Sequence, residues 1–196
     1  QYIPPSEQGS IDVYFCPREN CENVIIELID KSQGINCAFY DLDSINRISK
    51  LKEKENVKIV SDNINQLNLK DLDFVRFDDN QQLMHNKFCI FNSNKDKIVM
   101  TGSLNPTSGL NKDNLAVIKS NFLAENYQSE FDELWSNNFG KGDKVKYPKI
   151  KINDFLIENY FCPEDNCEEQ LLNLIENANK RIYFMTFSFT SNIVGD

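Results

Sequence analysis

A nonapeptide that occurs twice limits the folds that are open to this chain. FCPRENCEN spans residues 15–23 and FCPEDNCEE spans residues 161–169, and six of the nine positions are identical. Each copy leads into a helical pattern and then into an apolar strand pattern. Two copies of the same helix-to-strand opening predict an internal repeat, with a complete first unit followed by the start of a second, similar unit.

Strand and helix patterns alternate along the first unit. Apolar side chains recur at helical spacing over residues 24–32, 44–55 and 123–140. Short apolar runs bounded by turn residues predict strands over residues 35–42, 57–60, 73–77, 87–91, 97–101 and 115–119. This alternation predicts a layered α/β sandwich.

The composition of the sequence changes after the last helical pattern of the first unit, where a basic stretch with Gly and Pro begins. We expect a first domain over residues 11–140, a linker over 141–159, and the opening helix and strand of a second unit over 160–196. Within the second unit, the helical pattern covers 167–181 and the strand pattern covers 182–190. Because one helix and one strand cannot enclose a core, the second unit must pack on the first, pair with another chain or continue in a longer protein.

The charge balance bounds the partners of the chain. It has 30 acidic and 21 basic side chains, a formal net charge of −9 at pH 7, which disfavours indiscriminate tight binding to nucleic acid or anionic membranes but allows a locally basic cleft. No apolar run approaches the roughly 20 residues of a membrane helix. Because the chain begins at Gln1 without a signal peptide, we expect that an upstream secretion signal or membrane anchor has been removed. A cytoplasmic location is the alternative.

The six cysteines fall into two kinds. Four lie in the repeated nonapeptide with C-x4-C spacing: Cys16, Cys21, Cys162 and Cys167. With one histidine in the chain and no tight C-x2-C pair, this spacing argues against a metal site, whereas export would allow a local disulfide in each copy. Cys37 and Cys89 stand alone in apolar strand patterns, and we interpret them as buried small hydrophobic residues.

The candidate chemistry lies between the two copies, in MHNKFCIF and MTGSLN. His85 is the only histidine, and Lys87 is two residues away, so in a strand both side chains share one face. The next strand pattern ends at Gly102, which permits close backbone approach, and Ser103 and Asn105 again share one face. The four polar side chains would meet in one pocket. They suit a phosphate diester, because lysine neutralises the non-bridging oxygens, serine and asparagine donate hydrogen bonds, and histidine attacks phosphorus.

HNK at 85–87 followed by GSLN at 102–105 resembles the H-x-K…G-S-x-N signature of the phospholipase D superfamily. The repeated openings, the EFDELW helix and the linker into a second copy are similar to family members with two motif-bearing halves. On this resemblance, residues 11–140 correspond to one full half and residues 160–196 to the opening of the second. The resemblance implies a layered α/β/α sandwich with a mixed central sheet.

The same resemblance implies a metal-independent phosphodiesterase that needs no cofactor and acts through a phosphohistidine intermediate. Catalytic roles would fall to His85, Lys87, Ser103 and Asn105. In the family two such motifs meet, with one histidine becoming the phosphohistidine and the other protonating the leaving group. This chain has one motif and would supply half of an active site. The second histidine would come from a second half in cis, from a separate fragment or from a homodimer, and the sequence leaves open which role His85 takes.

The chain departs from the family pattern beside the motif. The family usually has an aspartate where this chain has Asn92, and the nine residues between Asn92 and Gly102 form a longer hairpin than is usual. Because that aspartate is mostly a supporting residue, the change bears on rate more than on reaction type. Asn92 and Gly102 are therefore expected to support the site.

The substrate class is less constrained than the reaction. Nucleic acids and phospholipids present nearly the same phosphodiester group to these residues, but HNKF and TGSLNPT are more similar to nuclease-like members, which favours nuclease-type hydrolysis of nucleic acid. The alternatives are a phospholipid phosphodiesterase or transphosphatidylase, and a non-catalytic half that binds phosphate. The basic stretch at 141–151 could lie along a nucleic-acid backbone or a lipid surface, and we interpret it as a solvated linker.

Overall fold

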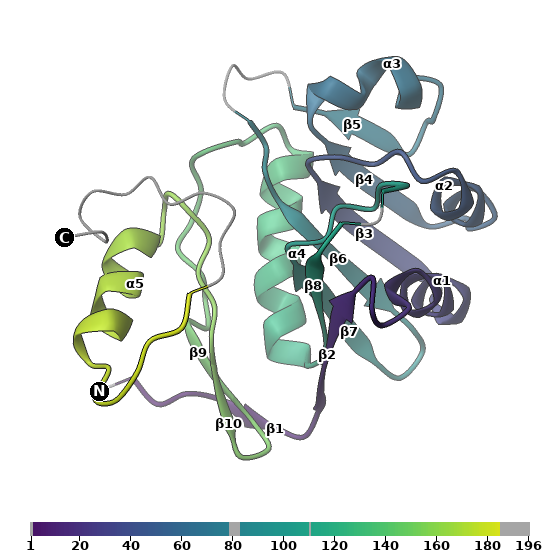
Figure 1. Cartoon of the computed structure of the whole chain (residues 1–196). Coiled ribbons are helices and arrows are strands. Elements are labelled where there is room, and N and C mark those ends of the chain that lie inside the picture. Colours follow the sequence, from purple (N-terminus) through teal and green to yellow (C-terminus); the bar gives the residue numbers. More distant parts are fainter. Residues whose placement is uncertain (1, 79–82, 110, 185–196) are drawn as a thin grey trace.

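A mixed sheet of seven strands organises the part of the chain that the computed structural model describes, residues 2–78, 83–109 and 111–184 (Figure 1). The strands are β2 (Ser10–Cys16), β3 (Gly34–Phe39), β4 (Val57–Ser61), β5 (Val75–Phe77), β6 (Lys87–Asn92), β7 (Lys97–Gly102) and β8 (Asp113–Lys119). Their order in the sheet is β2-β8-β7-β6-β3-β4-β5. Strands β3, β4 and β5 run parallel, whereas the other neighbouring pairs are antiparallel.

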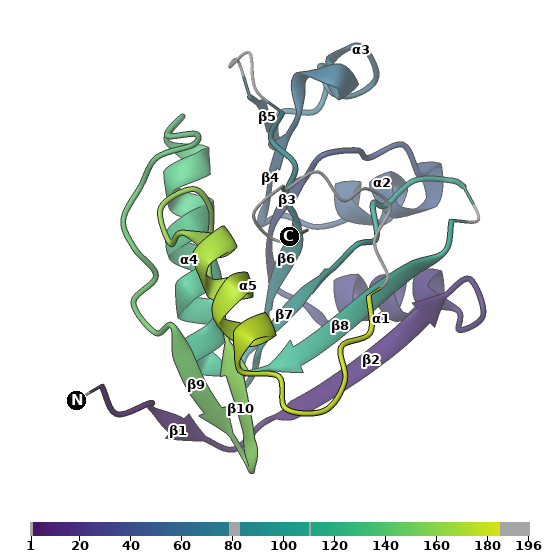
Figure 2. The ribbon, with the colours of Figure 1, turned by 60° about the vertical axis from the view of Figure 1, so that its left-hand side comes forward.

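Helices cover both faces of the sheet (Figures 1 and 2). α1 (Cys21–Lys31) and α2 (Ile45–Lys52) lie on one face, and α4 (Asn121–Trp135) lies on the other. A 3-10 turn, η1 (Asn63–Asn65), and the short α3 (Gln66–Leu69) connect β4 to β5. The mixed α/β fold that the alternating patterns predicted is confirmed.

The two-residue period of β3 explains how one strand serves two cores. Ile35, Cys37 and Phe39 point into the core beneath α1 and α2, whereas Ala38 points into the core beneath α4. All four are buried. A strand that is covered on both faces has an almost continuous apolar sequence, and for this reason the sequence of β3 predicted a strand.

Side-chain caps begin the two longest helices. The Asn20 side chain accepts a hydrogen bond from the Asn23 backbone at the start of α1, and the Ser120 hydroxyl accepts one from the Leu123 backbone at the start of α4. α4 ends at Trp135, five residues before the end of its sequence pattern. Asn137 then takes a left-handed conformation with φ of 64°, which turns the chain away from the helix axis.

The segment expected as a linker, residues 141–159, carries two strands. β9 (Lys149–Ile152) and β10 (Phe155–Glu158) form a hairpin, and β9 also pairs in parallel with β1 (Ser6–Glu7), which makes a small three-stranded sheet. Ile150 and Ile152 are fully buried in the core beneath α4. This hairpin brings the second nonapeptide copy alongside the first unit.

The second copy forms a helix whose apolar side chains remain accessible. α5 (Cys167–Glu176) is shorter than the pattern over 167–181 and has no buried residue. Of the expected strand over 182–190, residues 182–184 have no regular structure and the rest lie outside the described residues. None of the described helices is long and apolar enough to span a membrane.

All six cysteines form disulfides: Cys16–Cys21, Cys37–Cys89 and Cys162–Cys167. Cys37 and Cys89 are buried, as expected, but their interpretation as lone hydrophobic residues is corrected. The antiparallel register of β3 and β6 places them directly opposite each other, with their Cα atoms 4.1 Å apart. This bond links two central strands, whereas the other two bonds close short loops within the nonapeptide copies.

Candidate active site

The candidate residues gather at one edge of the sheet. Lys87 begins β6 and pairs with Phe39 at the end of β3, while Gly102 ends the antiparallel β7 at the same edge. The parallel strands β3, β4 and β5 also end here. Ligands of open α/β sheets bind at the carboxyl ends of the parallel strands, so this edge is the expected place for a site.

Two neighbouring loops hold the backbone around His85. The buried carboxylate of Asp62, which follows β4, accepts a hydrogen bond from the Met84 backbone N–H at 2.9 Å. The backbone N–H of Tyr40, which follows β3, donates to the Asn86 carbonyl at 2.9 Å. The residues on both sides of His85 are therefore anchored, and its imidazole projects from a fixed stretch of chain.

The ammonium of Lys87 lies against the His85 ring. Its Nζ is 3.1 Å from Nε2 and 3.2 Å from Nδ1 of His85, and it donates to the His85 carbonyl at 3.1 Å. Tyr40 packs against both groups, with its ring centroid 4.7 Å from that of His85 and 5.3 Å from the lysine Nζ. An imidazole and a cation thus share one small space, as binding and attack on one phosphate require.

Electrostatics favours the neutral form of His85. Burial lowers the pKa of the imidazole, and the nearby Lys87 charge lowers it further, against an opposing effect of Asp62. Burial also lowers the pKa of Lys87, while the charges of Asp113 and Asp41 oppose that change. A neutral imidazole retains the lone pair that a nucleophile needs.

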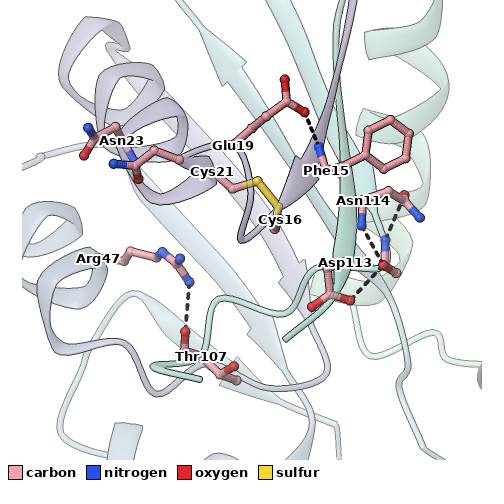
Figure 3. The surroundings of a disulfide bond; sticks show 11 residues. Phe15, Cys16, Glu19, Cys21, Asn23, Arg47, Thr107, Asp113 and Asn114 are labelled. Atoms are coloured by element: carbon pink, nitrogen blue, oxygen red, sulfur yellow. Dashed lines mark hydrogen bonds between the residues drawn. A yellow bond between two sulfur atoms is a disulfide. The ribbon is translucent and has the colours of Figure 1, made fainter. Parts of the chain in front are cut away.

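Ser103 is held by the start of β8. Its hydroxyl donates to the Asp113 carboxylate at 2.8 Å and accepts from the Asn114 backbone N–H at 3.0 Å. Figure 3 shows Asp113 and Asn114 beside the Cys16–Cys21 disulfide. Gly102 has a φ of +147°, and a Cβ there would lie 2.4 Å from the Asn114 carbonyl oxygen, so glycine is needed for this approach.

The structure brings together four of the predicted residues and leaves two apart. His85, Lys87, Gly102 and Ser103 line one cavity of about 400 Å³. Asn105 does not line it, because the chain leaves β7 at Gly102 and the alternation of a strand does not continue. Its buried Oδ1 has no hydrogen-bond partner among the described residues. Asn92 lies at the other end of β6, paired with Lys97.

The loop that carries Asn105 is fixed by the start of α2. The Asp43 carboxylate accepts from the Ser108 backbone at 2.6 Å, and the buried Arg47 donates to the Thr107 carbonyl at 3.3 Å. The Arg47–Thr107 contact appears in Figure 3. Asn105 is therefore positioned by a helix far from it in sequence.

A larger cavity of about 750 Å³ adjoins the first. Both cavities are lined by His85, Asn86, Tyr160 and Phe161, and the larger one also by Cys162 and Cys167 of the second disulfide. The second nonapeptide copy thus forms one wall of the candidate site. Among the described residues there is no cluster of three or more His, Cys, Asp or Glu that could hold a metal ion.

Among the residues that contact or line the site, sequence reasoning missed Tyr40, Asp113, Tyr160 and Phe161. Tyr40 and Asp113 could have been suspected as polar residues beside a strand end, but nothing in the sequence pairs them with His85 or Ser103. Tyr160 and Phe161 carried a clearer signal, because YFCP occurs both at 14–17 and at 160–163. The aromatic pair is thus part of the repeat.

Glu130 of α4 lines the larger cavity and supports a prediction about stability. Burial, followed by the charges of Glu164 and Glu133, raises its pKa from 4.5 to about 7. A carboxyl group whose pKa is raised in the folded state contributes its full stability at pH values below its unfolded pKa. This contribution to the free energy of unfolding is lost as the pH rises through 7. We expect Glu130→Gln, which mimics the protonated acid, to increase the free energy of unfolding by up to about 3 kcal/mol near pH 8.

Chemical denaturation at several pH values checks this expectation. The difference between Glu130→Gln and the unmodified chain should shrink as the pH falls and disappear near pH 4, where both forms carry no charge at this position. Glu176→Gln, an exposed position in α5, is the matched control and should leave the pH profile unchanged. A stabilisation of equal size at all pH values would contradict the assigned charge state.

Comparison with known proteins identifies a family and similar folds. Residues 17–135 match the family described as "Cardiolipin synthase, PLD-like domain". NucT from Helicobacter pylori has a similar structure, with a TM-score of 0.53 and 14% sequence identity over 66% of this chain and 98% of that chain. TrmBL2, an archaeal chromatin protein, gives a TM-score of 0.45 and 14% identity over 65% of this chain and 53% of that chain. No curated protein matches the sequence.

A fold and a candidate site of this kind define a phospholipase D-like protein. Since the family match spans more than half of its length, the chain belongs to the PLD-like domain family of that description. At 14% sequence identity, the likeness to NucT concerns the fold alone.

Proposed function

We propose that this chain is a phosphodiesterase of the phospholipase D type that hydrolyses phosphodiester bonds of nucleic acid through a phosphohistidine at His85. One observation carries the proposal. The Lys87 ammonium lies within 3.2 Å of both ring nitrogens of His85, at an open cavity that Ser103 also lines. A phosphate that replaced this contact would bind the cation and meet the nucleophile at once.

The proposed reaction has two steps. In the first, a ring nitrogen of His85 attacks phosphorus, the bond from phosphorus to the leaving oxygen breaks, and a second histidine protonates that oxygen. In the second, this histidine takes a proton from water, the water oxygen bonds to phosphorus, and the bond to His85 breaks. Lys87 and Ser103 bind the non-bridging oxygens in both steps.

The lowered pKa of His85 supports the role of nucleophile over that of general acid. The second histidine has to be supplied by a second motif-bearing half, because this chain has one histidine. That half could be joined in cis, be a separate fragment or be another copy of the chain. No metal ion takes part in these steps, since Lys87 and its counterpart provide the positive charge.

A cationic surface beside Trp135 supports nucleic acid as the substrate. Arg76 lies 4.0 Å above the Trp135 ring, and Lys58 lies 5.3 Å from it. The cavity lined by Arg76 and Trp135 shares Leu134 with the larger cavity beside His85. These two cations would attract the phosphates of a nucleic-acid backbone. Phospholipid hydrolysis or transphosphatidylation, and phosphate binding without catalysis, are the rival functions.

Trapping of the intermediate tests the proposal. A phosphodiester labelled at phosphorus is mixed with the chain in EDTA, alone or with a second motif-bearing half, and the reaction is quenched after milliseconds. We expect acid-labile label on the protein, and none on His85→Asn. Turnover without trapped label would assign His85 the acid role. Label from phospholipid vesicles alone would support the lipid function, and neither label nor turnover from any assembly would leave phosphate binding.

A further inference from the structure

The second nonapeptide copy is packed against the strand that carries Lys87. The Phe161 ring lies 4.9 Å from the Tyr127 ring and 6.4 Å from the Phe88 ring, and Phe88 and Tyr127 are 5.0 Å apart. Phe88 follows Lys87 in β6, and Tyr127 belongs to α4. Two of these contacts are edge-to-face and the contact between Phe88 and Phe161 is tilted. Such aromatic clusters add stability beyond the area that they bury, so Phe161 anchors this wall of the site.

Tyr160 differs from Phe161 in what its ring contacts. Within the described residues, it stacks on no other ring, although it lines both cavities that contain His85. Its hydroxyl donates to Glu158 at 2.9 Å, and Glu158 in turn accepts from Lys149 at 3.0 Å. Burial and the bond to Glu158 raise the pKa of Tyr160 to about 12, so the phenol stays protonated and keeps donating. The hydroxyl end of Tyr160 is thus held by Glu158, while the residue lines both cavities.

The charges of the larger cavity indicate which part of a substrate would enter it. Glu130 and Glu164 line it, and a phosphate would be repelled by these carboxylates and attracted to Lys87. A neutral planar group with N–H donors would suit both the carboxylates and the aromatic ring. Nucleobases have this chemistry, because every base has a stacking face and most have an exocyclic amino group.

We propose that Tyr160 is a specificity-determining residue whose ring stacks on the nucleobase next to the scissile phosphate. This inference rests on the proposed function and adds a base-binding subsite to it. With the phosphate at Lys87 and His85, the neighbouring base would enter the larger cavity against Tyr160. The subsite would favour single strands, whose bases can leave the stack, over paired duplexes.

Binding measurements test the ring directly and require no turnover. A fluorescently labelled single-stranded octanucleotide is titrated with the full chain carrying His85→Asn, and its anisotropy gives Kd. We expect Tyr160→Leu to raise Kd about tenfold, whereas Tyr160→Phe stays within about twofold. Tyr183→Leu, an exposed tyrosine that lines neither cavity, is the matched control and should change nothing. An abasic oligonucleotide should bind equally to all variants.

Two outcomes would overturn the stacking role. The first is an unchanged Kd in Tyr160→Leu. The second is a loss of affinity in Tyr160→Phe equal to that in Tyr160→Leu, because this would assign the effect to the hydroxyl. A parallel cleavage assay separates this failure from that of the proposed function. Cleavage that depends on His85, with the same KM in Tyr160→Leu as in the unmodified chain, would remove the base subsite alone. Hydrolysis of phospholipid vesicles without cleavage of oligonucleotides would remove both proposals.

Discussion

Replacing His85 with asparagine is expected to reduce phosphodiester turnover by at least about 10⁴-fold, because the covalent intermediate can no longer form. Asparagine has a similar size and keeps a hydrogen-bonding group beside Lys87, so substrate binding should change much less than turnover. The measurement is steady-state cleavage of a single-stranded oligonucleotide by the assembly that is active with the unmodified chain. Far-ultraviolet circular dichroism and the thermal midpoint verify that the variant is folded.

The pH profile gives this prediction a second readout. His85 must be neutral to attack, and its pKa lies below the ordinary value because of burial and of the Lys87 charge. On the acidic side of the pH profile, the decrease in kcat/KM should therefore occur at a lower pH than it would for an unperturbed histidine. Neutralising the cation with Lys87→Met would move this decrease to higher pH, in addition to weakening phosphate binding.

Chemical rescue by imidazole tests whether the lost turnover is due to the missing His85 side chain. In His85→Gly, added imidazole should restore part of the turnover by occupying the vacant space, while Tyr183→Leu should respond to imidazole no more than the unmodified chain does. A His85→Asn variant that retained more than a tenth of the original turnover would show that the nucleophile is elsewhere.

Removing the Cys37–Cys89 disulfide is expected to lower the free energy of unfolding by about 4 kcal/mol. The bond joins residues 52 positions apart, and a cross-link that closes a long loop restricts the unfolded chain most. Both sulfurs are buried between central strands, so the double replacement Cys37→Ala and Cys89→Ala also leaves a small cavity. Denaturation in urea measures the change.

The disulfide of the first nonapeptide copy is the matched control. Cys16 and Cys21 are five positions apart, and the same chain-entropy argument gives about 2 kcal/mol for Cys16→Ala with Cys21→Ala. If the two double variants lost equal stability, the effect would lie in the packing of the sulfur atoms and not in the length of the closed loop.

Local patterns predicted the elements that position the site well. The strands expected at 87–91 and 97–101 are observed as β6 and β7 with one further residue each, because buried apolar runs between turn residues have few other conformations. The spacing of HNK and GSLN also led to the family that the comparison with known proteins supports. Secondary structure of this kind depends mainly on neighbouring residues, so a single sequence is enough to predict it.

Contacts between distant segments could not be predicted in this way. Cys89 lies opposite Cys37 because of the register of β6 on β3, and Asp113 lies beside Ser103 because β8 returns next to β7. Tyr160 reaches the cavity because a hairpin within the expected linker carries it there. Strand register and the path of a hairpin depend on packing across the whole fold, which periodicity along one segment does not contain.

The two C-x4-C disulfides hold two different segments near the candidate site. Cys16 pairs with Asp113 across β2 and β8, while Cys162 and Cys167 line the larger cavity. Each bond closes a small covalent ring, which leaves the backbone of that segment few conformations even before a substrate arrives. Ordering the segments would then cost little conformational entropy on binding, so more of the contact energy can appear as affinity.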